Sequence, residues 1–409
     1  MSDILKNKFK RKFFSVFIFL KRILLKIIKS FFFFRGASTN FQPKTILILK
    51  VGGLGDFLFG IPALNLLRKM FPHARIILVT AKSLSELGFN SLNRDPTDTK
   101  RLPWLNLARN SVDDILVIND LSYKTIIKTS RLISKEGELG VFILGYPGMT
   151  IPSAIKKMLL IRMLVKGFVT CVGVDKKLDD ICMRKFQAQH NMYRHKMLGD
   201  IDSVLEVVPN NSFDENDLDF NVTINPLIKT QITQKLTLSV NDVLVLIAPV
   251  ATRIHKQWPL ENFVQITRDL RKVNANCKFI LIGTEDNYAE VEKFYHNIDF
   301  DVNNLCGHLS IEELAGLFSI AKGYIGNDGG MSQLAGMMGC PSVIVFNSVE
   351  EDWITHPWRS KNGVVRNRTA CSPCFNAITC PAGHRKCVID IPINAVLKKA
   401  NDIFFNVGV

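Results

Sequence analysis

The feature that most limits the fold of this chain is a repeated alternation of short apolar runs with segments of helical periodicity. Residues 44–50 (KTILILK) form one apolar run, and apolar residues then recur at helical spacing through DFLFGIPALNLLRKMF before the next run at 74–80. Strand, glycine turn, helix and strand in this order make one βαβ unit. Further strand candidates lie at 114–120, 140–146 and 168–174. Such a series predicts a parallel sheet covered by helices.

A second series of the same kind follows a polar stretch, VVPNNSFDENDLDFNVTINP. Its strands are expected at 243–250, 278–284, 323–328 and 342–347, and its helices at 259–273, 310–321 and 331–339. The 409 residues exceed the size at which one hydrophobic core usually stops growing. We therefore expect an α/β protein with two Rossmann-like doubly wound domains facing a central cleft, at 41–225 and 226–390, and a C-terminal helix at 391–409.

The N-terminal segment differs from the rest of the chain in charge. Residues 1–35 hold ten Lys or Arg and one acidic residue, whereas the whole chain has a net charge of +15. The longest nearly apolar run there, 13–20, is too short to span a bilayer, and Lys21 and Arg22 occupy the place of a signal-peptide cleavage site. Residues 1–40 are predicted to be a basic amphipathic helix on an anionic membrane surface, followed by a linker.

Two alternatives for this segment stay open, a disordered basic tail and a helix packed on the body of the protein. Nucleic-acid binding fits less well, because much aliphatic surface lies between the charges. Nine cysteines in a chain without a recognisable export signal suggest a reducing compartment.

The first candidate loop is KVGGLGDFLFGIPAL, at 50–64. Glycines such as Gly53 and Gly55 would let the backbone approach a phosphate at a helix N-terminus, as in a dinucleotide-binding fingerprint. That fingerprint also needs an acidic residue after the second strand, where LVTAKS supplies none. Asp56 is interpreted either as a helix cap or as a general base that takes a proton from an acceptor hydroxyl.

The second candidate loop is APVATRIHKQWPLENF, at 248–263. Thr252, Arg253 and Lys256 bring a hydroxyl and two cations between a strand and a helix. Such a group would neutralise a diphosphate leaving group. The alternative is a solvated basic loop without a ligand.

The third candidate loop lies within YIGNDGGMSQLAGMMGCPSVIVF, where a strand gives way to a helix. Backbone amides of residues 329–331 would face a phosphate there, beside Asp328, Gly329 and Gly330. In the alternative interpretation the two glycines make a tight turn and Asp328 caps it.

Together the three loops resemble glycosyltransferase family 9, the ADP-heptose:lipopolysaccharide heptosyltransferases. The resemblance extends from about Lys44 to Ile391. Its motifs are ILILKVGGLGDFLFGIPALNLLRKMFPHARI, PVATRIHKQWPLENF, LCGHLSIEELAGLFSIAKGYIGNDGGMSQLAGMMGCPSVIVF and CSPCFNAITC…HRKCVIDI. It implies a GT-B fold and metal-independent, inverting transfer of a sugar, a heptose from ADP-heptose, to a lipopolysaccharide core or related glycolipid.

The resemblance also implies roles for individual residues. Asp56 matches the family's proposed base, in an acceptor-side loop with Gly53 and Gly55. Lys256 matches a residue that binds the donor diphosphate. The other implied donor-binding residues are Thr252, Arg253, Glu285, Asp328, Gly329, Gly330 and Gln333. Two of them depart from the family pattern, since its serine is Gly329 here and its histidine is Gln333. Glutamine still donates a hydrogen bond but carries no charge.

The implied setting is the cytoplasm, with peripheral attachment to the inner membrane of a Gram-negative bacterium and no cofactor for catalysis. Three rival interpretations stay open. The chain would be a transferase that uses another nucleotide sugar, a catalytically inactive GT-B binding protein, or a dinucleotide-dependent oxidoreductase. The absent acidic residue after the second strand counts against the oxidoreductase.

Four cysteines lie close together near the end of the chain, Cys371, Cys374, Cys380 and Cys387, with spacing C-x2-C-x5-C-x6-C. Four thiolates at this spacing would hold a structural zinc ion, with His384 as a spare ligand. A zinc ribbon normally pairs two CxxC knuckles, and only one is present. Free or redox-active thiols and disulfides are the alternatives.

Overall fold

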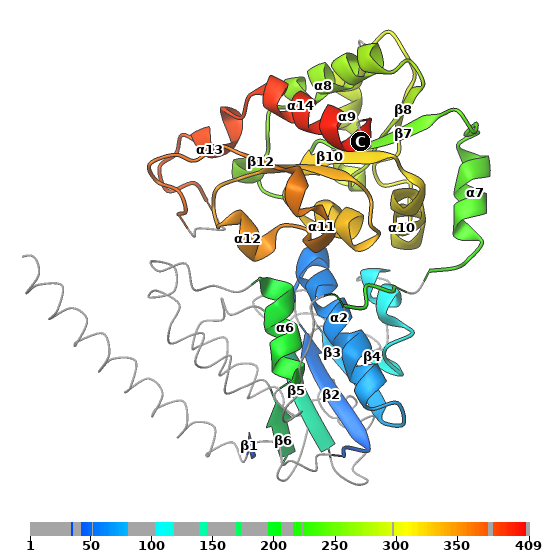
Figure 1. Cartoon of the computed structure of the whole chain (residues 1–409), viewed down its shortest axis with the longest axis vertical. Helices are drawn as coiled ribbons and strands as arrows, with labels where there is room; N and C mark the ends of the chain where they lie inside the picture. Colours follow the sequence, from blue (N-terminus) through cyan, green and yellow to red (C-terminus); the bar gives the residue numbers. More distant parts are fainter. Residues whose placement is uncertain are drawn as a thin grey trace, which may run out of the picture. The chain divides into compact units, whose positions relative to one another are not determined.

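The computed structural model describes residues 34–35, 42–50, 52–80, 103–117, 139–144, 169–172, 195–205, 216, 218–222, 224–296, 298–374 and 379–405. The chain divides by its internal contacts into two compact units, Met1–Val222 and Thr223–Val409. Each unit contains a sheet with helices packed on it (Figure 1). The predicted N-terminal amphipathic helix lies outside the described residues.

The first unit contains a six-stranded parallel sheet in the order β1-β6-β5-β2-β3-β4. The strands are β1 Phe34–Arg35, β2 Thr45–Lys50, β3 Arg75–Thr80, β4 Asp114–Val117, β5 Leu139–Leu144 and β6 Val169–Val172. The order of strands along the chain reverses between β2 and β5. In doubly wound sheets, ligands bind outside the carboxyl ends of the strands at such a reversal.

Two helices pack together on this sheet, α2 Leu54–Met70 and α6 Lys196–Leu205, and a 3-10 helix, η1, spans Pro103–Ala108 (Figure 1). Helix α2 follows β2 directly, and its residues 57–64 are buried without a break. Burial over two full turns means that the helix is covered on all sides there, and not along one apolar stripe. The first turn of α2 consequently lies at the carboxyl end of β2.

The second unit contains another six-stranded parallel sheet, in the order β12-β11-β10-β7-β8-β9. The strands are β7 Val243–Ala248, β8 Cys277–Leu281, β9 Val302–Asn304, β10 Gly323–Asn327, β11 Ser342–Phe346 and β12 Val364–Arg366. Here the order reverses between β7 and β10, which pair with Gly326 opposite Ala248. This is the arrangement of a dinucleotide-binding Rossmann sheet.

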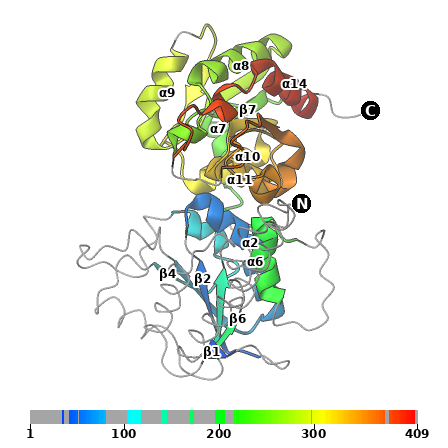
Figure 2. The same ribbon diagram turned by 90° about the vertical axis from the view of Figure 1, so that its left-hand side faces the viewer.

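Helices cover both faces of this second sheet (Figures 1 and 2). Helices α8, α9 and α14 lie on one face, and α10 and α11 lie on the other, with α7 packed on α10. The helices are α7 Ile228–Lys235, α8 Leu260–Val273, α9 Tyr288–Tyr295, α10 Ile311–Ile320, α11 Gly330–Met337, α12 Asp352–Thr355, α13 Lys386–Ile389 and α14 Ile393–Phe404. Short 3-10 helices are η3 Ile254–Lys256, η4 Glu285–Asn287 and η5 Trp358–Gly363.

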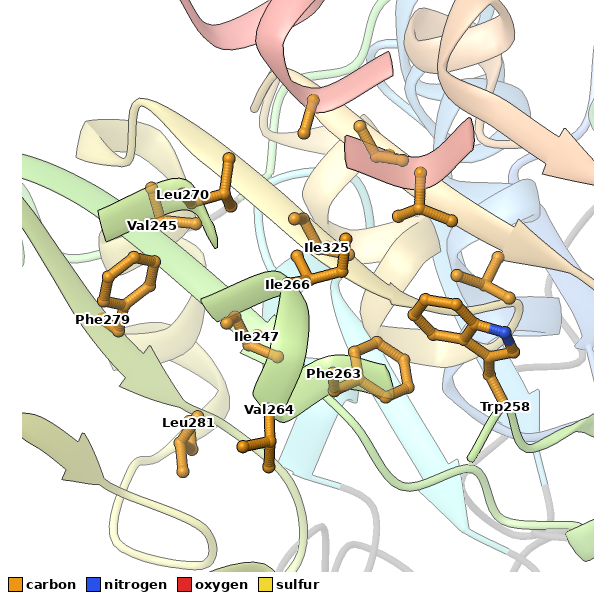
Figure 3. Close-up of a cluster of buried hydrophobic side chains, with 14 of the residues drawn as sticks. Val245, Ile247, Trp258, Phe263, Val264, Ile266, Leu270, Phe279, Leu281 and Ile325 are labelled. Atoms are coloured by element: carbon orange, nitrogen blue, oxygen red, sulfur yellow. The ribbon is translucent and has the colours of Figure 1, made fainter. Parts of the chain in front are cut away.

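The core beneath α8 and α14 fixes the position of the loop after β7 (Figure 3). Trp258 is fully buried, its ring lies edge-on to Phe263 at 5.1 Å, and its Nε1 donates to Ile391 O at 3.0 Å. Burying a large apolar side chain contributes roughly 1.5–3 kcal/mol, and the indole N–H needs such a partner when buried. The end of the loop is therefore held by the core.

The predicted α/β fold class is confirmed, since both units contain a parallel sheet with helices packed on it. Within the described ranges, no helix combines the length and the apolar character that crossing a membrane requires.

Candidate functional site

In the second unit, polar side chains from two loops lie together at the point where the strand order reverses. The loop 249–258 leaves the carboxyl end of β7, and Asp328 directly follows β10. Because β7 and β10 are neighbours in the sheet, residues that are distant in sequence meet there. Both predicted loops of this unit thus lie at the position where Rossmann sheets bind ligands.

An ion pair joins these two loops. The Nζ of Lys256 lies 3.0 Å from Oδ2 of Asp328, and Asn347 Nδ2 donates to the same oxygen at 3.1 Å. The Asp328 side chain is 9% exposed, whereas that of Lys256 is 25% exposed. Burial alone would lower the pKa of Lys256, but the Asp328 carboxylate, together with Glu350, raises that pKa above its ordinary value. The lysine is consequently a fixed cation that is only partly exposed to solvent.

Asn327 braces the loop that carries this lysine. Its Nδ2 donates to Pro249 O at 2.8 Å, and its Oδ1 accepts from Trp258 N at 2.9 Å. One buried amide side chain therefore ties the start of the loop to its end. Between these ties, Thr252 and Arg253 are exposed. The predicted hydroxyl and second cation are thus held on a braced loop and face solvent.

At the start of α11, the hydroxyl of Ser332 hydrogen-bonds to the backbone of the preceding turn. Gly329 N donates to Ser332 Oγ at 3.1 Å, and Ser332 Oγ donates to Gly329 O at 2.8 Å. The amide of Gly329 is therefore occupied, which differs from the expectation that it faces a phosphate. Gly330 begins the helix, and the first intrahelical hydrogen bond runs from Gln333 N to Gly329 O. The helical amides before Gln333 therefore have no acceptor within the helix. Asp328 does not cap this helix, because its carboxylate binds Lys256 and Asn347.

Gly329 itself has room around it. Its φ of 172° is extended backbone that any residue adopts, and a Cβ placed there would meet no atom within 4 Å. The glycine at this place is therefore not required by the fold.

Gln333, where the family has histidine, is engaged in packing. It is 7% exposed, and its Nε2 donates to Thr355 O at 2.6 Å. The side chain ties α11 to α12, so its amide nitrogen is bound within the protein.

Glu285 lies after β8, the second strand of this sheet in chain order, and is exposed in η4. Gly307 approaches it closely, since a Cβ on Gly307 would lie 2.5 Å from Glu285 Cα, and its φ is +76°. Only glycine suits that conformation and contact. An acidic residue at the end of the second strand is the one that binds a ribose in Rossmann sheets.

The predicted loop of the first unit is simpler. Asp56 is exposed in the first turn of α2, whose N-cap is Gly53, and no side chain caps this helix. Across the described residues, Asp56 receives neither a hydrogen bond nor an ion pair. Gly52 adopts a φ of +149°, and a Cβ there would lie 2.7 Å from that of Asp56. The loop therefore holds an uncommitted carboxylate, which argues against the interpretation of Asp56 as a cap.

Below this loop lies a buried ion pair between Lys50, at the end of β2, and Asp200 of α6; their side chains are 3% and 1% exposed. Gly60 leaves the room for this lysine, since a Cβ there would lie 3.0 Å from Lys50 Cε. The pair anchors α6 to the strand that precedes the loop. Gly55, predicted on the acceptor side, lies half-buried in the first turn of α2.

The cysteine group at 371–387 is the predicted zinc site. Cys371 is exposed, and its Sγ lies 3.7 Å from His384 Nε2. Among the described residues, no three His, Cys, Asp or Glu side chains converge as metal ligands would. The arrangement thus gives the structural zinc hypothesis no support. By contrast, Cys277 and Cys306 are buried in the core, and burial raises the pKa of each thiol to about 11.

Two functional candidates were missed in the sequence, Asn327 and Asn347. Each directly ends or follows an apolar strand, in GYIGN and SVIVFN. A polar residue at the carboxyl end of a parallel strand is the signal that would have found them.

These features define a class of protein. Two Rossmann-like units in one chain make the GT-B fold, and solved heptosyltransferase-family structures share it. Residues 182–384 match the family model described as glycosyltransferase family 9 (heptosyltransferase), so the predicted resemblance to that family is confirmed.

The similar proteins cover different shares of the chain. Lipooligosaccharide heptosyltransferase 2 of Campylobacter jejuni is 28% identical over 153 residues, which are 37% of this chain and 47% of that protein. The chain thus spans about half the length of the curated relatives it matches.

Two solved structures share the fold along nearly the whole chain. A family 9 glycosyltransferase from Veillonella parvula has a TM-score of 0.61 at 16% identity and covers 90% of this chain and 99% of its own. ADP-heptose lipopolysaccharide heptosyltransferase II of E. coli has a TM-score of 0.61 at 14% identity and covers 88% of this chain and 98% of its own.

Proposed function

We propose that this protein is a metal-independent, inverting glycosyltransferase that moves a heptose from ADP-heptose to a lipopolysaccharide core or related glycolipid. The observation that carries the proposal is the Lys256–Asp328 pair at the strand reversal of the second unit, within the residues that match family 9. The names of the similar proteins, a lipooligosaccharide heptosyltransferase and an ADP-heptose lipopolysaccharide heptosyltransferase, support the choice of donor and acceptor.

The second unit is the proposed donor side. Lys256 places a cation at the carboxyl end of β7, and Thr252 and Arg253 add a hydroxyl and a second cation on the same braced loop. The helix N-terminus that starts at Gly330 also favours an anion. We assign the ribose hydroxyls to Glu285; its place after the second strand of the sheet supports this role.

The proposed reaction breaks the bond between the anomeric carbon and the diphosphate oxygen. The electron pair of that bond stays on the diphosphate, where Lys256 and the first-turn amides of α11 stabilise the new negative charge. An acceptor hydroxyl oxygen attacks the opposite face of the carbon, which inverts its configuration. Because these groups supply the stabilisation that a divalent cation provides elsewhere, we expect no metal requirement.

The first unit supplies the proposed base. Asp56 is exposed, and within the described part of the chain it has no bonding partner, so it is free to take the proton of the attacking hydroxyl. Gly53 at the N-cap is exposed, and a Cβ there would meet no atom within 4 Å, so the helix start is accessible to an acceptor. A carboxylate already paired with a cation would be a weaker base.

The proposed setting is the cytoplasmic face of the inner membrane of a Gram-negative bacterium, where a glycolipid acceptor is anchored. The basic residues of segment 1–35 would hold the protein on an anionic leaflet. Deleting residues 1–35 should abolish co-sedimentation with phosphatidylglycerol vesicles and leave transfer to a soluble acceptor intact. Unchanged co-sedimentation would exclude this role for the segment.

One observation favours a second candidate, a transferase with another nucleotide sugar. Gln333 replaces the family's histidine, and its amide nitrogen is bound to Thr355 O. The resemblance implies that this histidine contacts the donor, so its replacement would alter the sugar or nucleotide accepted. A competition between ADP-, UDP- and GDP-sugars separates the two candidates.

The experiment that tests the proposal is a transfer assay with purified full-length protein, ADP-heptose, a heptose-free lipopolysaccharide core acceptor and EDTA. We expect one heptose added per acceptor, release of ADP, and an anomeric configuration opposite to that of the donor by NMR. Retained configuration would overturn the mechanism. Absence of transfer with every nucleotide sugar would favour an inactive binding protein.

A further inference from the structure

Asn347 is a buried side chain at the candidate donor site that the proposed reaction does not use. It directly follows β11 and is 1% exposed. Its Nδ2 donates to Asp328 Oδ2 at 3.1 Å, and its Oδ1 accepts from Val349 N at 3.2 Å. The backbone N–H of Val349 needs an acceptor, so the amide of Asn347 must present its nitrogen to Asp328. The orientation of this donor is therefore fixed by the chain itself.

Asp328 receives its two donors on a single oxygen. Lys256 Nζ lies 3.0 Å and Asn347 Nδ2 3.1 Å from Oδ2. In the described part of the chain, Oδ1 accepts no hydrogen bond. With both donors on one oxygen, the carboxylate cannot rotate without losing one of them. Lys256 is thus held in one place relative to β10.

A diphosphate at this site would compete with Asp328 for the lysine. Asp328 is nearly buried, and a buried carboxylate without a donor is costly. Glu350 adds further negative potential around Lys256. Unless another donor stays hydrogen-bonded to Asp328, the carboxylate would hold the Lys256 ammonium in the ion pair and repel the diphosphate.

We propose that Asn347 is a positioning residue. It keeps Asp328 hydrogen-bonded while the ammonium group of Lys256 also interacts with a diphosphate ligand. This inference rests on the proposed function in that it takes the diphosphate of a nucleotide sugar as the ligand. Asn347 does not touch that ligand. Its effect passes through Asp328 to Lys256.

The most direct test is Asn347→Asp, which keeps the shape of the side chain. When ionised, the introduced carboxylate has no proton to donate and repels Asp328. Burial and this like charge raise the pKa of the introduced carboxyl, so at lower pH it is protonated and donates to Asp328 Oδ2 again. Loss at high pH with rescue at low pH is a signature that a purely packing role would not produce.

The first readout is calorimetric binding of inorganic pyrophosphate to the full-length protein in EDTA. We expect Asn347→Asp to weaken binding about 10- to 100-fold relative to wild type at pH 8, the effect of losing a hydrogen bond to a charged group. At pH 5.5 the ratio to wild type should return to within about threefold. Pyrophosphate titrates equally in both measurements at one pH, so its titration cancels in the ratio of variant to wild-type affinity.

A matched control is Asn367→Asp. Asn367 Nδ2 donates to Lys386 O at 3.0 Å, so the same chemical change removes one hydrogen bond without touching Asp328. We expect pyrophosphate affinity within about twofold of wild type at both pH values. Circular dichroism at each pH verifies that all variants are folded at the assay temperature.

If Asn347→Asp does not fold, Asn347→Ser serves instead, since a hydroxyl retains a donor at shorter reach. We expect it to bind pyrophosphate more tightly than Asn347→Ala does. Equal affinity of the serine and alanine variants, or a loss in Asn347→Asp that is the same at both pH values, would overturn the inference.

The inference and the proposed function fail in different ways. Wild-type protein that binds pyrophosphate but transfers no heptose would refute the proposed donor while the role of Asn347 is still measured. Wild-type protein that binds no pyrophosphate would overturn the inference. With active protein, Asn347→Asp should raise the donor KM more than it lowers kcat at pH 8.

Discussion

The two loops that carry the proposed chemistry are built in opposite ways. In the second unit, Lys256 and Asp328 neutralise each other, and buried asparagines brace both the loop and the carboxylate. In the first unit, Asp56 is exposed, and the described residues offer it no partner. Both loops nevertheless lie at the carboxyl end of the first strand of a parallel βαβ series.

The difference follows from what each group is proposed to do. A cation that stabilises a leaving diphosphate acts best when fixed in advance, because no reorganisation is then needed during the reaction. A base must instead be unpaired, since a cation beside it would lower its affinity for the proton. Substitutions on the two sides should therefore separate proton transfer from donor binding.

The largest effect is expected from Asp56→Asn in the first unit. Removing a general base typically lowers the rate by about 10²–10⁴-fold, so kcat should fall by that amount. ADP affinity by calorimetry should stay within about twofold of wild type, because Asp56 lies outside the donor side. A fall in ADP affinity that matched the fall in kcat would erase the contrast between the two loops.

The next largest effect is expected from Lys256→Met. Loss of one preorganised stabiliser of the leaving group lowers kcat by roughly 10²–10³-fold. Unlike Asp56→Asn, this variant should also bind ADP at least about tenfold more weakly, since it loses a charged contact. Wild-type ADP affinity in Lys256→Met would show that the lysine serves only to neutralise Asp328.

The ion pair also predicts a pH dependence of stability. The pKa of Lys256 is raised in the folded protein, so the pair stabilises the fold fully below the unfolded lysine pKa of about 10.4. That contribution is lost as the pH rises through the folded pKa. Urea unfolding of wild type and Lys256→Met from pH 8 to 11 should give a difference in unfolding free energy that shrinks above about pH 10.4. A difference that grows with pH would contradict the pairing.

Two glycines of the second unit differ in the space around them, Gly336 being packed and Gly329 open. A Cβ on Gly336 would collide with Pro357 Cβ, so Gly336→Ala should lower the unfolding free energy by about 1–3 kcal/mol. A Cβ on Gly329 meets nothing, so Gly329→Ala should change it by less than about 0.5 kcal/mol. Chemical denaturation measures both, and equal losses would show that the start of α11 is not open.

The smallest effect is expected from Gly329→Ser, which restores the family's residue. The side chain has room, and its hydroxyl adds a donor beside the first-turn amides of α11. We expect ADP affinity to rise by no more than about tenfold, the value of one hydrogen bond. Reduced affinity would indicate that the open space at Gly329 is itself filled by the donor.

Much of the fold could be predicted because its central strands are continuous apolar runs. Strands β2, β7, β10 and β11 are buried along almost their whole length, so they stand out in the sequence. Strands β9 and β12 were missed, since each has three residues and is only partly buried. Short edge strands carry too few apolar residues to give a signal.

The site was predicted as separate residues but not as an arrangement. Lys256 and Asp328 were each expected at the donor, but their pairing depends on which strands are neighbours and in what register. The bracing by Asn327 and Asn347 was missed because an asparagine after a strand more often marks a turn. Gln333 was expected to contact the donor, whereas its bond to Thr355 O depends on how α11 packs on α12.

The central claim is that the second unit binds a nucleoside diphosphate sugar without metal. The most direct test is calorimetric titration of the protein lacking residues 1–35 with ADP, UDP, GDP and NAD in EDTA. The account predicts binding of ADP in preference to the other three, with affinity lost in Lys256→Met and kept in Asp56→Asn. Binding of NAD alone, or binding of any nucleotide that Lys256→Met leaves unchanged, would contradict it.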